Sequence, residues 1–135
     1  MTAQTLEQRR AKHALEKIKS VNQDKADDYV RHVKALPAAI LMNGLGQALA
    51  TELASGKNDS DPHRLLAKHV SEWLLSKEAH TKYPSEGPRA DAASLLDQIV
   101  AGDQDAYLWA QTEAIAYVTW LKKFANAFLD PPRKE

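Results

Sequence analysis

The sequence predicts an all-α protein, a compact helical bundle of about six helices that spans residues 1–135 as a single domain. Apolar residues recur every three or four positions through most of the chain, and no stretch shows the strict alternation of a half-buried strand. Capping residues, Gly and Pro divide the chain into segments of helical length. The longest segment contains neither Gly nor Pro and lies at the C-terminal end.

The first two expected helices are marked by their starts and by apolar positions on one side. Thr5 and Gln8 have the spacing of a capping box, and the apolar period that follows continues to about Val21. A second, shorter helix is expected over about 25–35, where one tyrosine and two valines share a face.

The third expected helix covers about 37–54. Pro37 permits either a break before it or a new first turn. We expect burial on most sides, because seventeen consecutive residues here carry no charge. Gly44 and Gly46 would each cost about 1 kcal/mol inside a helix, so close approach of a neighbouring helix is expected to compensate. Asn43 then needs a hydrogen-bond partner in the core or at its edge.

Two further helices are separated by an exposed connector. A fourth helix is expected over about 62–79, with Asp61 as its cap and Pro62 at its first position. Residues 80–90 contain two prolines and a glycine and are predicted to form the connector. A short helix over 91–101 follows and ends at a glycine.

The last expected helix runs from Asp103 to Asp130 and is the predicted spine of the bundle. Asp103 can cap its start, and Pro131-Pro132 stops it. Its central apolar face consists of Tyr107, Ala110, Ala114, Tyr117, Val118, Leu121, Phe124, Ala125 and Phe128. Trp109, Trp120 and Ala127 widen that face. The remaining narrow strip carries Thr112, Thr119, Lys122, Lys123 and Asn126.

Composition limits the function. The 18 Lys and Arg residues balance 18 Asp and Glu residues, which argues against a strong free-standing nucleic-acid binder. Residues 1–34 carry eight basic against five acidic residues, whereas 91–135 carry four against seven, a split that suits end-to-end contacts between copies or a solvated surface. The chain has no cysteine, its N-terminal residues lack the apolar core of a signal peptide, and no run is long enough to span a membrane. We therefore expect a cytoplasmic protein without a membrane partner.

No pattern in the chain is typical of catalysis. His69 and Glu72 have a spacing that occurs in metal sites, but a di-metal bundle needs that motif twice together with two further glutamates. No nucleophile is paired with a base, and no carboxylate cluster suits two-metal chemistry. The sequence therefore predicts neither an enzyme nor a metal or other cofactor.

Basic residues on the first and last helices have two interpretations. Arg10, His13 and Lys17 follow one flank of the first helix, which suits either phosphate binding or ordinary solvent exposure. Lys122 and Lys123 lie near the end of the spine helix, where lysines also interact favourably with the helix dipole.

Three blocks of sequence carry a resemblance to a known family. They are 5–11 (Thr-Leu-Glu-Gln-Arg-Arg-Ala), 36–45 (Leu-Pro-Ala-Ala-Ile-Leu-Met-Asn-Gly-Leu), and 108–116 followed by 120–125 in the spine. In this order and spacing, the chain resembles the small α-helical subunit of the type III-B CRISPR RAMP-module (Cmr) effector complex. The blocks fall near the start, middle and end, so the resemblance spans nearly the whole chain.

The resemblance implies a non-catalytic structural subunit of an RNA-guided, RNA-targeting ribonucleoprotein in antiviral defence. Copies of such a subunit stack into a minor filament beside the RAMP backbone subunits and under the large polymerase-like subunit. They lie along the duplex of guide RNA and target RNA, and the backbone subunits cleave the target.

The resemblance also implies which side chains face RNA. Arg9 and Arg10 match an Arg pair of the family, and Lys122 and Lys123 match a basic pair before Phe. Together with Lys17, these are the predicted RNA-binding residues. The chain departs from the family pattern in two places. Gln111-Thr112-Glu113-Ala114 stands where relatives often read Thr-Arg-Glu-Ala, which removes one basic contact, and Thr119 stands where Asn is frequent.

One alternative stays open. The chain suits a homo-oligomeric helical adaptor that contacts only protein, with its basic residues merely solvated.

Overall fold

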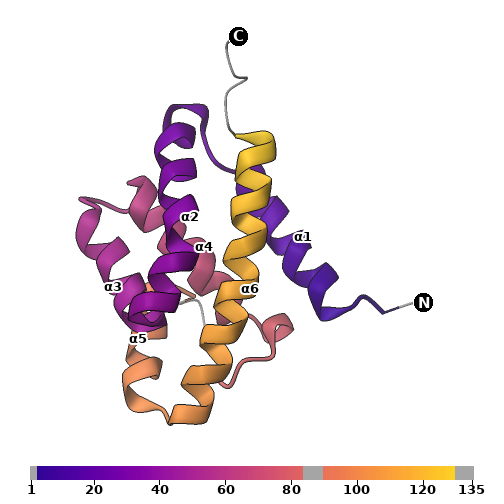
Figure 1. Ribbon diagram of the computed structural model, residues 1–135, viewed down its shortest axis with the longest axis vertical. Helices are drawn as coiled ribbons and strands as arrows, with labels where there is room; N and C mark the ends of the chain where they lie inside the picture. Colours follow the sequence, from indigo (N-terminus) through magenta and orange to yellow (C-terminus); the bar gives the residue numbers. More distant parts are fainter. Residues whose placement is uncertain (1–2, 84–89, 130–135) are drawn as a thin grey trace.

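The computed structural model describes residues 3–83 and 90–129, which form helices joined by loops and contain no strand (Figure 1). In chain order the elements are α1 (Leu6–Lys19), α2 (Gln23–Asn43), α3 (Leu45–Ser55), α4 (Pro62–Leu74), the 3-10 helix η1 (Lys77–Ala79), α5 (Ala92–Ala101) and α6 (Gln104–Phe128). The prediction of an all-α bundle is therefore confirmed. Of the predicted exposed connector at 80–90, residues 84–89 lie outside the described residues, as does the predicted stop at Pro131-Pro132. Tyr83, which belongs to this connector, is buried rather than exposed.

The predicted helix starts are formed by local hydrogen bonds. Thr5 and Gln8 make both bonds of a capping box: the Gln8 amide donates to Thr5 Oγ1 over 3.1 Å, and the Thr5 amide donates to Gln8 Oε1 over 2.8 Å. The carboxylates of Asp61, Asp91 and Asp103 each accept an amide hydrogen from the first turn of α4, α5 or α6, each over 2.9 Å. Such caps satisfy amide groups that have no partner inside the helix.

The boundary between the second and third helices differs from the prediction. α2 continues through Pro37, where Leu36 and Ile40 on either side are buried in the core. The chain instead changes direction at Gly44, whose φ of 89° favours glycine. The amide of Gly44 still donates to Ile40, and its carbonyl already accepts from Ala48, so this residue ends α2 and begins α3.

Gly44 and Gly46 lie against α6, as the expected close approach requires. A Cβ placed on Gly44 would lie 2.9 Å from Tyr107 Oη, and one on Gly46 would lie 3.6 Å from the same atom. Side chains of α6 also cap α3: Gln111 Oε1 accepts the Leu45 amide over 2.9 Å, and Tyr107 Oη accepts the Gly46 amide over 3.0 Å. The junction of α2 and α3 is therefore fixed by α6.

The fourth helix ends earlier than expected. α4 stops at Leu74, and the next residues form the short helix η1, which ends at His80 with a φ of 57°. The apolar residues Leu75 and Ala79 remain buried. The apolar pattern therefore correctly indicated which residues are buried, but it did not show where the helix ends.

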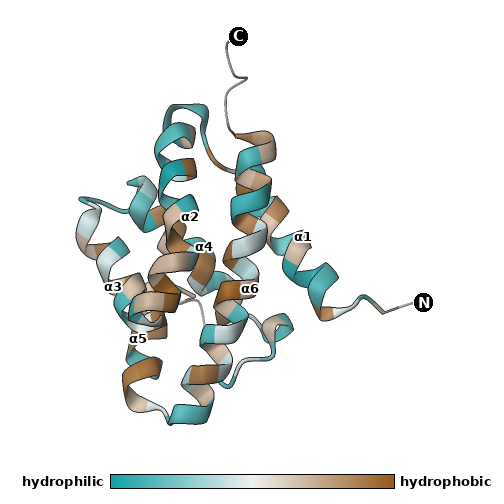
Figure 2. Cartoon of the chain, viewed as in Figure 1, coloured by the Kyte–Doolittle hydropathy of each residue, from teal (hydrophilic) through white to brown (hydrophobic). Residues whose placement is uncertain are grey.

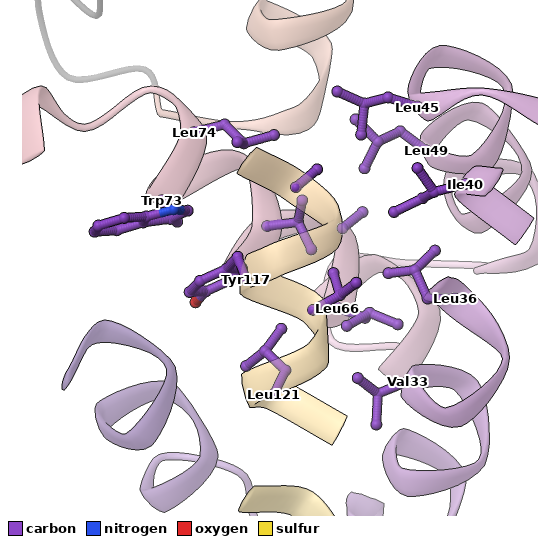
Figure 3. Close-up of a cluster of buried hydrophobic side chains, with 14 of the residues drawn as sticks. Val33, Leu36, Ile40, Leu45, Leu49, Leu66, Trp73, Leu74, Tyr117 and Leu121 are labelled. Carbon is purple, nitrogen blue, oxygen red and sulfur yellow. The ribbon is translucent and has the colours of Figure 1, made fainter. Parts of the chain in front are cut away.

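α6 lies at the centre of the bundle, in agreement with its predicted role as a spine. It packs against α1, α2, α3 and α4. Figure 3 shows Tyr117 of α6 on the same side of that helix as Trp73 of α4, while Val33, Leu36 and Ile40 of α2 lie on the other side. Tyr117, Val118 and Leu121 are fully buried.

Several predicted core positions are exposed. Trp109 and Phe128 on α6 are 54% and 60% exposed, because they lie where the neighbouring helices do not cover α6. The uncharged segment is not buried on most sides either, since Leu41 and Met42 near the end of α2 are 68% and 83% exposed. Asn43 is exposed as well and needs no partner in the core. Figure 2 shows hydrophobic positions at this end of α2.

The helices are too polar or too short for a bilayer. No helix within residues 3–83 and 90–129 has both the length and the apolar character needed to cross a membrane.

Candidate nucleic-acid interface

The five predicted RNA-binding residues lie on α1 and α6, which pack side by side (Figure 1). Arg10 contacts Glu113, and one turn further on His13 contacts Tyr117. Residue numbers therefore rise in the same direction along both helices, so the two run parallel. Lys122 and Lys123 lie nine and ten residues beyond Glu113, which places them about 14 Å along α6 from the level of Arg10.

Arg10 is engaged inside the protein. Its Nε donates to Glu113 Oε2 over 2.5 Å, and its Nη2 donates to Glu113 Oε1 over 2.7 Å. The Trp73 indole donates to Glu113 Oε2 over 2.9 Å. The side chain of Glu113 is 5% exposed and that of Arg10 is 14% exposed. The hydrogen bond to Glu113 raises the pKa of Arg10. With these two charge-assisted hydrogen bonds, Arg10 compensates the cost of burying the Glu113 carboxylate.

The next two residues on the same flank of α1 also point into the bundle. His13 Nδ1 and Tyr117 Oη are 2.6 Å apart and share a hydrogen bond, and burial lowers the pKa of His13. Lys17 Nζ donates to Glu72 Oε2 over 2.7 Å, and both side chains are about a quarter exposed.

We call these contacts the polar seam, whose members are Arg10, His13, Lys17, Glu72, Trp73, Glu113 and Tyr117. The seam joins α1 to α4 and α6. The sequence pattern that suggested a phosphate-binding or solvated flank is therefore the packed side of α1.

Arg9 links the start of α1 to η1. Its guanidinium donates to the Gln4 carbonyl over 2.7 Å and lies 3.3 Å from His80 Nε2. Its Nε atom is buried and has no hydrogen-bond partner among the described residues. The unpaired Nε therefore lies inside the protein, whereas Nη1 and Nη2 already have neighbours in Gln4 and His80.

Lys122 and Lys123 are the predicted cations with free ammonium groups. Lys123 is exposed and Lys122 is half-buried, and neither makes an ion pair or hydrogen bond within residues 3–83 and 90–129. Consecutive helical residues point about 100° apart, so the two lysines diverge around α6. They lie on the part of α6 alongside the last turn of α1, where Lys19 is also exposed.

The sequence interpretation missed the acidic half of the seam. Glu113 falls between Ala110 and Ala114 on the buried face of α6, and a carboxylate at such a position signals an internal cation partner. Its partner is 103 residues away in the sequence, so the pairing itself was not visible.

His69 and Glu72, whose spacing occurs in metal sites, have protein partners. His69 Nδ1 lies 2.7 Å from Tyr29 Oη, and Glu72 binds Lys17 rather than pointing to a shared centre with His69. In the described part of the chain, no group of three or more His, Cys, Asp or Glu residues has an arrangement that could hold a metal ion.

Comparisons with known proteins agree on one family. The model of the family described as CRISPR-associated protein (Cas_Cmr5) matches residues 6–128. A curated relative from Thermotoga maritima, named CRISPR system Cmr subunit Cmr5, is 30% identical over 135 residues, which is all of this chain and 93% of the relative. The fold is similar to that of the crystal structure of a CRISPR-associated Cmr5 family protein from Thermus thermophilus. That match has a TM-score of 0.72 at 23% identity and covers 95% of this chain and 100% of the other.

Proposed function

Because this chain belongs to the Cmr5 family of CRISPR-associated proteins, we propose that it is the non-catalytic small subunit of a type III-B CRISPR (Cmr) ribonucleoprotein that targets RNA. The single observation that carries the proposal is the family match, which spans residues 6–128 and therefore nearly the whole bundle. In this role the subunit acts in the cytoplasm and takes part in antiviral defence.

The subunit stacks with further copies of itself into a minor filament. The filament lies beside the RAMP backbone subunits and the large polymerase-like subunit, and it helps to hold the duplex of guide RNA and target RNA. A chain with zero net charge supports this arrangement, because it neutralises few phosphates by itself. Weak contacts become effective when neighbouring subunits fix the domain next to the RNA, since linked sites act at a high effective concentration.

Within the predicted RNA-binding set, we assign the direct phosphate contacts first to Lys122 and Lys123, because their ammonium groups are free in the described structure. Arg9 is a further contact, since its side chain is partly exposed at the start of α1. Arg10 and Lys17 would have to exchange a carboxylate for a phosphate, so their proposed role is to position α1 beside the RNA.

The test is reconstitution of the effector complex with Lys122→Ala and Lys123→Ala combined in one chain. We expect lower affinity for target RNA and a weaker dependence of that affinity on salt, because two counterion-releasing contacts are removed. Lys57→Ala is the matched control: it removes an exposed lysine from the loop between α3 and α4, on the side of the bundle away from α1 (Figure 1). Wild-type affinity and salt dependence in the double variant would reject the assignment of these lysines.

The engaged state of Arg10 and Lys17 favours one alternative, a helical adaptor that binds copies of itself and other proteins but no RNA. The two functions differ in the response to nuclease. An adaptor assembles equally well after the RNA has been digested, and it tolerates the Lys122→Ala/Lys123→Ala change without loss of target binding.

A further inference from the structure

Two histidine rings from different helices are stacked face to face. His32 lies in the middle of α2 and His63 lies in the first turn of α4. Their ring centroids are 3.5 Å apart, and the angle between the ring planes is 16°. Glu52 of α3 completes the cluster, because both of its carboxylate oxygens lie 3.3 Å from His63 Nδ1. One residue from each of three helices therefore meets here, at a place separate from the polar seam.

The start of α4 is held against α2 at this cluster. Asp61 accepts the amide hydrogen of His63 over 2.9 Å, so the cap of α4 fixes the backbone that carries the ring. Lys25 in the first turn of α2 donates to the carbonyl of Ser60 over 2.6 Å. The start of α4 and the loop before it are therefore tied to α2 by a bond at Lys25 and by the stack at His32.

The cluster does not have the geometry of a metal site. The lone pair of an imidazole nitrogen lies in the plane of the ring, so two parallel stacked rings direct their lone pairs along parallel planes rather than toward one centre. The arrangement is suited instead to control how many protons the pair holds.

The stack accommodates one positive charge but not two. A protonated imidazole can lie on the face of a neutral one, since a cation is attracted to the face of an aromatic ring. Two protonated rings at a centroid distance of 3.5 Å repel each other, because like charges disfavour the charged form of both groups. Glu52 selects the ring that carries the single charge, since its carboxylate contacts His63.

The surroundings of His32 favour its neutral form. Burial lowers the pKa of His32, and the neighbouring His63 and Arg31 lower it further, whereas Asp28 and Asp61 act in the opposite direction. The folded chain therefore binds this proton less readily than the unfolded chain does. The stabilising effect of a neutral His32 is complete above the ordinary pKa of histidine and is lost as the pH falls below it.

Glu52 faces the other ring of the stack. Burial raises the pKa of Glu52, its hydrogen bond to His63 lowers it, and Asp61 raises it. The side chain of Glu52 is 12% exposed and that of His63 is 25% exposed, so the contact between them is partly shielded from water. An ionised Glu52 and a protonated His63 stabilise each other, which keeps the first proton of the pair on His63.

We propose that the stack of His32 and His63 is a proton-operated latch between α2 and the start of α4, closed while the pair holds no more than one proton and open when both rings are protonated. In the open state His32 turns toward solvent, which it reaches because it is only half-buried. The apolar contacts of the helices remain, since Val33 and Leu66 are fully buried in the core. The latch goes beyond the proposed function and does not depend on it.

NMR of the full chain observes the latch directly. Single His→Gln variants assign the ring signals, and a nuclear Overhauser effect between the ring protons of His32 and His63 reports the stack. We expect this effect at neutral pH and its loss as His32 takes up its proton, while the signals of the buried core keep their positions. A ring-to-ring effect that persists when both histidines are protonated overturns the proposal.

Two variants test whether the rings are coupled. His63→Gln removes the neighbouring cation, and Glu52→Gln removes the carboxylate that keeps the proton on His63, so both should move the titration of His32 to higher pH. Glu16→Gln is the matched control, because it removes an exposed carboxylate of α1 and should leave that titration unchanged. Circular dichroism verifies the fold of each variant. If His32 titrates alike in the wild type and in His63→Gln, the rings are independent and the latch is rejected.

Two substitutions at position 32 test the mechanical consequence without a change of pH. His32→Lys places a permanent cation against His63 and mimics the open latch, whereas His32→Phe supplies a neutral ring that stacks at any pH. The amides of His63 and Leu65, which are both bonded to Asp61, should exchange with solvent about threefold faster or more in His32→Lys. They should exchange at the wild-type rate in His32→Phe. Equal exchange in the two variants would show that the stack does not hold the start of α4.

Discussion

Glu113 is a nearly buried carboxylate whose charge is balanced by Arg10 and by the Trp73 indole. Removal of one member of such a pair leaves an uncompensated charge, whereas replacement of both by apolar residues is often tolerated. The two members differ in their access to water, because Arg10 is more exposed than Glu113 and has the longer side chain.

We therefore predict that Arg10→Met lowers the free energy of unfolding by about 3–5 kcal/mol, and more than Glu113→Gln does. The double variant Arg10→Met/Glu113→Leu should be more stable than Arg10→Met alone. Urea denaturation measures these differences, with exposed Glu16→Gln as a control that changes stability by no more than about 0.5 kcal/mol. Equal losses in the Arg10→Met and double variants would show that the charge of Glu113 is not what Arg10 compensates.

Gly44 and Gly46 form a matched pair that separates backbone strain from helix propensity. Gly44 has a φ of 89°, and an added Cβ would lie 2.9 Å from Tyr107 Oη, so Gly44→Ala should lower stability by about 1–3 kcal/mol. Gly46 lies in the first turn of α3, and its added Cβ would make ordinary contacts at 3.6 and 3.7 Å. Gly46→Ala should be neutral or stabilise by up to about 1 kcal/mol. Thermal unfolding compares the two, and equal effects would contradict the strain at Gly44.

At the scale of helices, signals that depend on neighbouring residues were predictable from sequence. The Thr5–Gln8 capping box and the Asp61 and Asp103 caps all form as expected, because each needs only residues within one turn. The break between α2 and α3 was misplaced, since Pro37 is a strong local signal. The actual break at Gly44 is fixed by Tyr107 and other side chains from α6, which sequence spacing does not reveal.

The candidate site was predictable only in part for the same reason. The two basic pairs were singled out because their members are adjacent in the sequence, and their contact with RNA stays a prediction. Lys122 and Lys123 make no ion pair or hydrogen bond within residues 3–83 and 90–129. The distant carboxylate partners of Arg10 and Lys17 were not found, since they come from α6 and α4. Periodicity places a side chain on a face of a helix but does not identify what packs against that face.

The packing of α2 on α4 should respond to acid. His69 of α4 hydrogen-bonds Tyr29 of α2, and burial lowers the pKa of His69 to about 3, with Lys17 a further cause. As the pH falls below about 6.5, His69 therefore binds a proton in the unfolded chain but not in the folded chain. Stability is complete above about pH 6.5 and falls as the pH drops toward 3, by up to about 1.4 kcal/mol per pH unit for this one group.

The corresponding measurement is urea denaturation of wild type and His69→Gln between pH 5 and pH 7, where most carboxylates remain ionised. We expect the free energy of unfolding to depend less steeply on pH in His69→Gln, because the titrating imidazole has been removed. The exposed variant His80→Asn should keep the wild-type dependence. Parallel curves for wild type and His69→Gln would exclude His69 as a source of the acid sensitivity.

At the scale of the whole molecule, the distribution of charge matters more than its sum. The chain is neutral overall, and the polar seam holds Arg10 and Lys17 in internal ion pairs, so these two cations are not free for an external phosphate backbone. The bundle therefore suits a part that is held against RNA by its neighbours.

This distribution predicts the behaviour of the isolated chain with duplex RNA. With Lys122, Lys123 and Arg9 as contacts, binding should be weak, and log Kobs should fall with log salt concentration with a slope of about −2 to −3, since each phosphate contact contributes about −0.7 to −0.9. Lys122→Ala/Lys123→Ala should reduce the magnitude of the slope by about 1.5, while Lys57→Ala leaves it unchanged. Fluorescence anisotropy over a salt series measures both. A slope of about −5 or steeper would mean that more cations than these three contact the RNA, and the assignment of the contacts to Lys122, Lys123 and Arg9 would then be wrong.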